Sequence, residues 1–369
     1  MIDAPPASPQ LEISVFGPGI GECVVIHIGD GDWLVIDSCV DRQSRRPVAL
    51  DYLRSLGVDV ASKVKLVVAT HWHDDHIRGL AEILRRAEIA KFVNSAAYSF
   101  RELVRVVELG SRTAPQSSAT TEFNGILRVL EQRRQRGERR DAVGPVPALA
   151  NKKLLALTGA DRSVAAEIFA LSPADGVFNL AQAELRDALA AITQRRRPSR
   201  QGPNQLCVVL WLKVGVLDVL LGADLEDVAG TTEGWKAIIA SGERPNGRAE
   251  FFKVPHHGSE NADCPECWTD LLVDQPIAIV TPYAPSMLPR RADIVRLCAR
   301  TPRVFLTSDP ARFGVPRRDN AVEKTLRELA VTRRALAGQM GHVRLRVDAR
   351  NSTNVPSIHL QNGARQLCT

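Results

Sequence analysis

The chain has 369 residues, of which 44% are hydrophobic, a proportion that is ordinary for a globular protein with a large core. No apolar run approaches the roughly 20 residues that a membrane-spanning helix needs, so we expect no membrane segment. The formal net charge is +6 and is carried mostly by arginine, which by itself indicates only a basic, solvated surface.

The start of the chain and its cysteines both indicate a cytoplasmic protein. The first residues include acidic Asp3 and several prolines in place of a basic segment, so they are not expected to form a signal peptide. The seven cysteines are an odd number spread thinly over a long chain, which is not typical of a disulfide framework. We therefore expect reduced thiols.

The first third of the chain is predicted to contain strands and helices in turn. Apolar and β-branched runs bounded by glycine-rich turns predict strands at residues 11–16, 23–28, 33–36 and 64–69. Helical spacing of apolar residues predicts helices at 47–56, where Gly57 ends the helix, and at 80–87.

The middle of the chain, about residues 100–200, is predicted to be a helical, arginine-rich insertion within a single domain that spans 1–369. One segment in it, residues 166–171, reads as a strand of the main sheet. A basic disordered linker is the alternative, but the spacing of the leucines argues against it; these are Leu149, Leu154, Leu155 and Leu157.

The second half returns to strands separated by helices, of which the clearest is residues 322–329. Strand clusters in both halves, with helices between them, predict an α/β fold in which two sheets pack face to face under a cover of helices. The strands are predicted at residues 206–212, 217–221, 251–254, 278–281, 304–307 and 342–347.

The segment Thr-His-Trp-His-Asp-Asp-His at residues 70–76 directly follows a strand of buried type. Three imidazoles and two carboxylates this close together are poor core material, because each would need a partner if buried. As metal ligands, His71 and His73 can reach one ion. Asp75 and His76 can reach a second ion about 3.5–4 Å away, the usual separation in two-metal sites.

This pattern resembles the HxHxDH signature of the metallo-β-lactamase superfamily. The resemblance implies a metallo-β-lactamase αββα sandwich, here with a helical insertion, and a hydrolase that uses two divalent metal ions, zinc or manganese. Asp37 matches the acidic residue that supports the metal loop in that family, and Asp224 matches the aspartate that bridges both metals. Residues 253–259, Lys-Val-Pro-His-His-Gly-Ser, are similar to its late histidine motif.

The residues within these motifs are more similar to those of the DNase-like domain of ComEC-type competence proteins than to those of class B β-lactamases. The superfamily normally supplies another histidine before the bridging aspartate, yet this sequence has none between His76 and His256. Asn204 is the candidate replacement and is equally well read as a turn residue at a strand start. A site with one imidazole fewer favours manganese over zinc.

The remaining roles follow from the same resemblance. His256 is the preferred ligand of the second ion, and His257 then faces the substrate or supports the ligands from outside. Asp74 or Asp75 accepts a proton during catalysis. Lys253 and Ser259 are candidate phosphate contacts.

The predicted function is a metal-dependent phosphodiesterase that acts as a DNA nuclease, with nucleic acid or another phosphodiester as its partner. One alternative is a hydrolase of a small ester, lactone, thioester or β-lactam, because a fold does not fix a function. The other is a nucleic-acid-binding module with a vestigial site. No membrane partner is expected, and partner proteins are not predicted.

Overall fold

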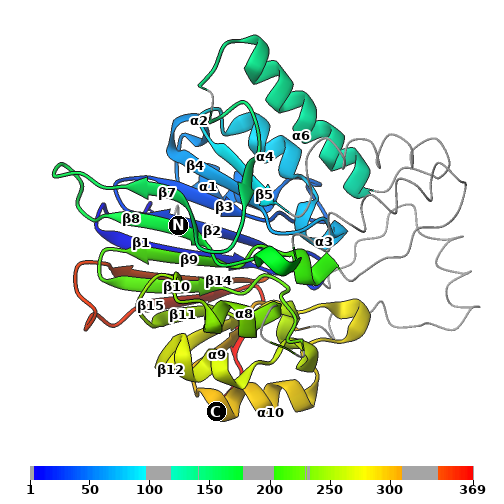
Figure 1. The fold of residues 1–369 in the computed structure, drawn as a ribbon, viewed down its shortest axis with the longest axis vertical. Coiled ribbons are helices and arrows are strands. Elements are labelled where there is room, and N and C mark those ends of the chain that lie inside the picture. Colours follow the sequence, from blue (N-terminus) through cyan, green and yellow to red (C-terminus); the bar gives the residue numbers. More distant parts are fainter. Residues whose placement is uncertain are drawn as a thin grey trace, which may run out of the picture.

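Two eight-stranded sheets lie face to face at the centre of the protein, with helices on their outer sides (Figure 1). The computed structural model describes residues 4–96, 118–139, 141–177, 203–228, 230, 233–309 and 340–368. One apolar cluster lies between the sheets and takes buried side chains from both, for example Ile26 and Leu212. The expected mixed α/β fold with two sheets is confirmed.

The first sheet contains the strands that lead to the histidine-rich loop. Its central strands β3 (Trp33–Ile36), β4 (Val64–Ala69) and β5 (Lys91–Ser95) run parallel, so their carboxyl ends lie at the same edge. In spatial order the strands are β15 (Ser357–Gln361), β14 (His342–Asp348), β1 (Gln10–Phe16), β2 (Cys23–Ile28), β3 (Trp33–Ile36), β4 (Val64–Ala69), β5 (Lys91–Ser95) and β6 (Val146–Ala148).

The second sheet contains the strands that lead to the later candidate residues. Four of its strands are parallel neighbours, which again brings their carboxyl ends to one edge; these are β10 (Leu217–Leu221), β11 (Ala249–Lys253), β12 (Leu272–Val280) and β13 (Val304–Leu306). In spatial order the strands are β16 (Arg365–Gln366), β13 (Val304–Leu306), β12 (Leu272–Val280), β11 (Ala249–Lys253), β10 (Leu217–Leu221), β9 (Leu210–Val214), β8 (Ala166–Ala170) and β7 (Lys152–Leu157).

Helices cover the outer face of each sheet through a further apolar cluster. On the first sheet these are α1 (Val48–Ser55), α2 (Val60–Lys63), α3 (Asp74–Ile77), α4 (Leu80–Arg86) and α6 (Ser118–Gln135). On the second they are α8 (Gly234–Ala240), α9 (Pro265–Asp270) and α10 (Arg291–Arg300). Short 3₁₀ turns occupy Pro203–Leu206, His256–Gly258, Glu260–Ala262 and Ala284–Ser286.

Several predicted strands are confirmed to the residue, namely β2, β3, β4 and β10. The strand predicted at 206–212 begins later, because Pro203–Leu206 forms a 3₁₀ turn and β9 starts at Leu210. The helix predicted at 322–329 lies outside the described residues. Within the described segments, no helix is long and apolar enough to cross a membrane.

The prediction that residues 100–200 form a helical insertion is wrong for the segment 146–157, which supplies β6 and β7 to the two sheets. A register shift in β7 between Lys153 and Leu155 lets Leu154 and Leu155 both be buried, so the leucine spacing imitates a helix. The long helix α6 fits the prediction, and residues 97–117 and 178–202 lie outside the described part. The single domain stays a prediction.

The expectation of reduced thiols is wrong for two of the seven cysteines, since Cys298 of α10 and Cys368 form a disulfide. They are 70 residues apart, and the antiparallel pairing of β16 with β13 brings the end of the chain beside α10. The other five cysteines are free and buried.

Candidate metal centre

The candidate residues meet where strands of both sheets end. Residues 71–76 follow β4, Asp224 follows β10, and the His256–Gly258 turn follows β11. In open α/β proteins, the carboxyl ends of parallel strands are where sites are built. Loops that are far apart in the sequence therefore place their side chains in one cluster.

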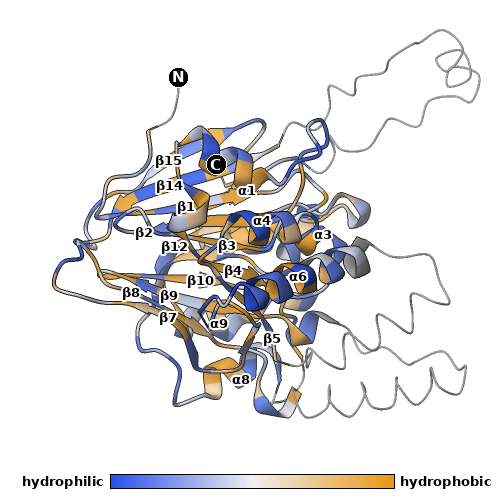
Figure 2. Ribbon diagram, turned by 90° about the horizontal axis from the view of Figure 1, so that it is seen from above, coloured by the Kyte–Doolittle hydropathy of each residue, from blue (hydrophilic) through white to orange (hydrophobic). Residues whose placement is uncertain are grey.

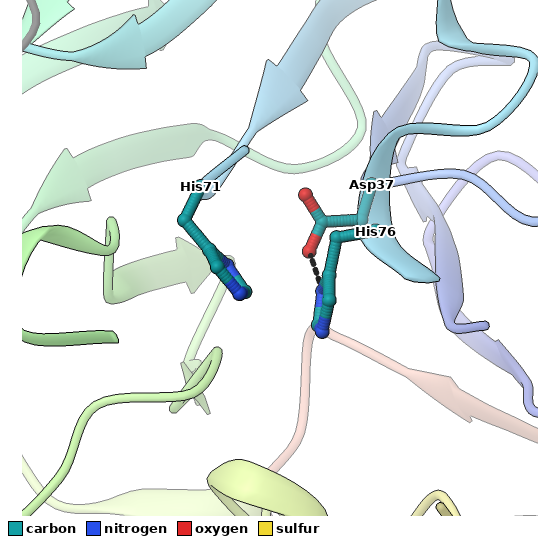
Figure 3. Close-up of side chains that lie close together, drawn as sticks. All are labelled: Asp37, His71 and His76. Carbon is teal, nitrogen blue, oxygen red and sulfur yellow. Dashed lines mark hydrogen bonds and ion pairs between the residues drawn. The ribbon is translucent and has the colours of Figure 1, made fainter. Parts of the chain in front are cut away.

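Asp37, which follows β3, forms hydrogen bonds with residues of the histidine loop, and Figure 3 shows the one with His76. Its Oδ2 lies 2.7 Å from His76 Nδ1 and accepts a 2.7 Å hydrogen bond from Thr70 Oγ1, while its Oδ1 accepts one from the Thr70 backbone N–H. Because the carboxylate accepts, His76 Nδ1 carries a proton and Nε2 faces the cluster. Outer carboxylates orient metal-binding histidines in this way.

Two groups of donor atoms lie beside each other in the cluster. His71 Nε2 is 3.0 Å from His73 Nδ1 and 3.8 Å from Asp224 Oδ2, which makes the first group. In the second group, Asp75 Oδ2 is 3.7 Å from His76 Nε2 and 3.6 Å from His257 Nε2. Within each group the donor atoms lie within 4.8 Å of one another, so each could hold a metal ion.

Asp224 joins the two groups. Its Oδ2 lies 3.4 Å from His76 Nε2 and 3.8 Å from both His71 Nε2 and His257 Nε2. Asp224 Oδ1, His76 Nε2 and His257 Nε2 are buried without a hydrogen-bond partner. Unsatisfied buried polar atoms are rare and costly, and a cation would satisfy all three. This donor set fits divalent metal ions.

The electrostatics of the cluster also suit a cation. Burial lowers the pKa of His71 and of His73. Burial acts in the same direction on His76, but Asp224 and Asp75 outweigh it and raise its pKa well above the usual value. Burial opposes the charge of both carboxylates, yet His76 and His257 keep the pKa of each well below its usual range. Both carboxylates therefore remain charged at neutral pH.

Of the two adjacent histidines, the structure places His257 in the cluster. His257 Nδ1 lies 3.1 Å from the Thr281 carbonyl oxygen, which accepts its proton and leaves Nε2 facing Asp75 and Asp224. His256 points elsewhere, with Nδ1 3.4 Å from Glu226 Oε1. Both residues have a positive φ, 44° and 55°, so the turn directs their rings to different partners. The preference for His256 over His257 as the ligand is therefore not supported.

Asn204 lies next to His256. Its Nδ2 donates to Glu226 Oε1 at 3.0 Å and lies 3.3 Å from His256 Nε2, while its Oδ1 is buried without a hydrogen-bond partner. The role of Asn204 as a replacement ligand stays a prediction. Glu226 was not singled out from the sequence.

Lys253 is not available to a substrate, which contradicts its predicted contact with phosphate. It is 2% exposed, and its Nζ lies 2.6 Å from Glu22 Oε2 and donates to the Ala223 carbonyl at 3.3 Å. Glu22 Oε2 also accepts a 2.5 Å hydrogen bond from Thr281 Oγ1. The buried pair thus contacts both the turn that carries Asp224 and the residue that orients His257.

Glu22 is a site residue that the sequence did not indicate by itself. Its carboxylate lies close enough to His76 and Asp224 for the three to form a further group of potential metal donors. Glu22 directly follows a glycine-rich segment, residues 17–21, and this is the only nearby signal in the sequence.

The two remaining predicted residues lie at the edge of the cluster. The side chain of Asp74 is 46% exposed and pairs with Arg78 Nη2 at 3.3 Å, so it faces solvent. Ser259 lines a small pocket beside Trp235 and Cys264. The described contacts bring neither side chain into the two donor groups.

Residues 16–135 match the sequence profile of the metallo-beta-lactamase superfamily, a range that includes Asp37 and the histidine loop. No curated protein shows significant sequence similarity to the chain.

Solved structures that are similar include the metallo-beta-lactamase fold protein YhfI from Bacillus subtilis, at 12% identity and a TM-score of 0.29 over 59% of this chain and 65% of that one. Metallo-beta-lactamase SMB-1 aligns at 14% identity and a TM-score of 0.32, over 80% of this chain and 87% of that one. The CmlA beta-hydroxylase aligns at 16% identity and a TM-score of 0.29, over 60% of this chain and only 31% of its own length.

The profile match, the two-sheet fold and the His/Asp cluster agree with one another. Residues 16–135 therefore resemble the metallo-β-lactamase superfamily in sequence, and the fold of the described residues is consistent with that resemblance.

Proposed function

We propose that this protein is a metal-dependent hydrolase that cleaves phosphodiester bonds in DNA. The observation that supports it most is the position of Asp224, whose Oδ2 lies within 3.8 Å of donor atoms from both groups. His71, His73 and Asp224 would hold one divalent ion, zinc or manganese, and Asp75, His76 and His257 a second. Ions in such a pair supply a nucleophile at neutral pH and charge stabilisation for the attacking and leaving oxygens of an in-line displacement.

The protein's own residues fix the geometry of this chemistry. Asp37 and Thr281 accept the Nδ1 protons of His76 and His257, so both rings present Nε2 to the centre. The low pKa of Asp75 keeps it anionic, which suits a ligand better than the predicted proton acceptor. Fixed donors of this kind need no rearrangement as charge develops in the transition state.

A phosphodiester substrate is supported by the chemistry of the centre and its border. Paired ions suit a substrate whose attacking and leaving oxygens both carry charge. The guanidinium of Arg78 is exposed directly beyond the histidine loop, and the planar fork of arginine matches phosphate oxygens. The resemblance of the motifs to ComEC-type DNase-like domains favours DNA among phosphodiesters.

The test uses the purified full-length chain with its metal content measured by mass spectrometry in the same preparation. With manganese or zinc it should cleave single-stranded DNA and bis-p-nitrophenyl phosphate, and Asp75→Ala should abolish both activities. Asp274→Ala, which removes an exposed carboxylate on β12, is the matched control and should retain them.

Two results contradict the proposal. Turnover of a lactone or thioester, with no phosphodiester cleaved under any divalent metal, would assign the centre to small esters. A folded protein that takes up no metal would make the site vestigial.

A further inference from the structure

We propose that an arginine-lined groove on the helical face of the first sheet binds the sugar-phosphate backbone of a nucleic acid and guides it to the candidate metal centre. This inference rests on the proposed phosphodiesterase function and adds the polymer and its path. The groove encloses about 1600 Å³ and is lined by α1, the segment 57–61, α4 and α6. In Figure 2, α4 and α6 lie side by side, and both contain hydrophilic as well as hydrophobic residues.

Arginine is the most frequent charged residue in the lining of the groove. Seven arginines and four carboxylates line it, and no lysine takes part. Six of these arginines lie on α1, the loop before it, and the region of α4: Arg45, Arg46, Arg54, Arg78, Arg85 and Arg86. Arginine holds phosphate through two parallel hydrogen bonds, so a groove of arginines suits the phosphates of a nucleic acid backbone better than a diffuse positive surface does.

Most arginines of the groove are ion-paired, and four of them pair with carboxylates outside its lining, namely Asp51, Asp74 and Glu138. Glu82 pairs with both Arg85 and Arg86, and Asp51 pairs with both Arg46 and Arg54, so each carboxylate serves two guanidinium groups. The arginine side chains in these pairs are 44% to 66% exposed. Exposed pairs contribute little to stability, so phosphates can replace the carboxylates at small cost.

Arg78 connects the groove to the metal centre. It lines the groove and directly follows α3, the helix that carries Asp75 and His76. Its carbonyl accepts a 2.7 Å hydrogen bond from Ser38 Oγ, which fixes its backbone, and its guanidinium pairs with Asp74 at the edge of the cluster. Because Arg78 borders both, a nucleic acid strand that lies in the groove is led to the histidine loop.

The extent of the groove favours a polymer over a small diester. It reaches from Arg78 to the segment 57–61, which precedes β4, while the metal loop follows that strand. A small phosphodiester in the centre cannot contact the distant end of the groove. A nucleic acid, with a phosphate at every nucleotide, can occupy both at once.

The experiment compares two double variants of the full-length protein. Arg85→Ala/Arg86→Ala removes two charges from the groove at exposed helix positions, where alanine preserves the helix. Arg134→Ala/Arg350→Ala removes two arginines that are 69% and 62% exposed and also ion-paired but do not line the groove. Binding of a labelled single-stranded oligonucleotide is followed by fluorescence anisotropy in EDTA across a series of salt concentrations. The kcat/KM for DNA and for bis-p-nitrophenyl phosphate is measured with metal.

The groove variant should bind and cleave DNA about tenfold more weakly, and its plot of log affinity against log salt should be less steep by about 1 to 2. Hydrolysis of bis-p-nitrophenyl phosphate should stay within about twofold in both variants, because the metal centre is intact. The control variant should bind and cleave DNA within about twofold of the wild type.

An equal loss of DNA binding in both variants, or none in either, would overturn the groove assignment and leave the phosphodiesterase proposal standing. A wild-type protein that binds the oligonucleotide through the groove but cleaves no phosphodiester would instead overturn the proposed function. A groove variant that also loses bis-p-nitrophenyl phosphate hydrolysis would show that these arginines act on the centre, which contradicts a distant binding surface.

Discussion

The candidate metal centre and the contacts of Arg133, which anchors α6, both bury charged side chains, yet they differ in how those charges are satisfied. Arg133 of α6 is 1% exposed, and its guanidinium donates to the carbonyls of Leu84, Ala87, Ala90 and Ala142 at 2.6 to 3.3 Å. In the centre, Asp224 Oδ1 and the Nε2 atoms of two histidines have no hydrogen-bond partner.

This difference distinguishes a buried charge that stabilises the fold from a buried cluster that can bind a ligand. A buried charge with all its partners present stabilises one packing, here α6 against the end of α4. A buried cluster that lacks partners is costly unless something else supplies them. The Arg133 contacts lie on the first sheet and the centre lies where strands of both sheets end, and only the centre has the composition of a metal site. The following predictions test that contrast, from the largest expected effect to the smallest.

Replacing the carboxylate shared by the two donor groups should have the largest effect on activity. Asp224→Asn keeps the shape of the side chain but removes its charge, so we expect hydrolysis to fall by at least about a thousandfold. Metal content by mass spectrometry should fall with it. An enzyme that keeps both ions and at least a tenth of its activity would contradict the shared role of Asp224.

Removing the anchor should affect stability and leave the chemistry alone. Arg133→Met deprives four carbonyls of their donors, so we expect a loss of about 3–4 kcal/mol in the free energy of unfolding, measured with urea. Arg134→Met, at the exposed neighbouring position, should change it by less than about 0.5 kcal/mol. Equal midpoints for the two variants would show that Arg133 is not an anchor.

The buried Glu22–Lys253 pair lies between these two cases, because it is satisfied and also contacts the centre. Lys253→Met leaves Glu22 buried without its counter-charge, which should cost about 3 kcal/mol of stability. Adding Glu22→Gln should restore most of it, since the lone charge is then gone. If the double variant regains stability but binds metal about tenfold more weakly, the pair positions the ligands. Full recovery of metal affinity would leave it a structural pair only.

The smallest effect is expected for Asp37, which contacts the histidine loop from outside the two donor groups. Asp37→Asn replaces the acceptor of the His76 Nδ1 proton, so metal affinity should fall about 10- to 100-fold while the fold is kept. Competition with a chelator measures the affinity, and Asp274→Asn on exposed β12 serves as the control. Unchanged affinity would mean that Thr70 and the strand end orient the loop without Asp37.

Local sequence determined much of the fold and the identity of most cluster residues. Runs of β-branched and apolar residues predicted β2, β3, β4 and β10 to the residue, because burial on both faces leaves a continuous apolar pattern. The density of imidazoles and carboxylates at residues 71–76 predicted the donor loop, and Asp37 and Asp224 followed from the resemblance of their motifs.

Tertiary structure decided what depends on partners far away in the chain. His257 enters the cluster and His256 does not because two consecutive positive φ angles turn their rings apart. Lys253 is withdrawn from the substrate because the loop before β2 brings Glu22 to it. The register shift in β7 gave its sequence a helical spacing of leucines. The Cys298–Cys368 disulfide joins residues 70 positions apart, which no local pattern indicates. Periodicity records which face of an element is buried, whereas the partner that meets a given side chain is fixed only when the two sheets pack together.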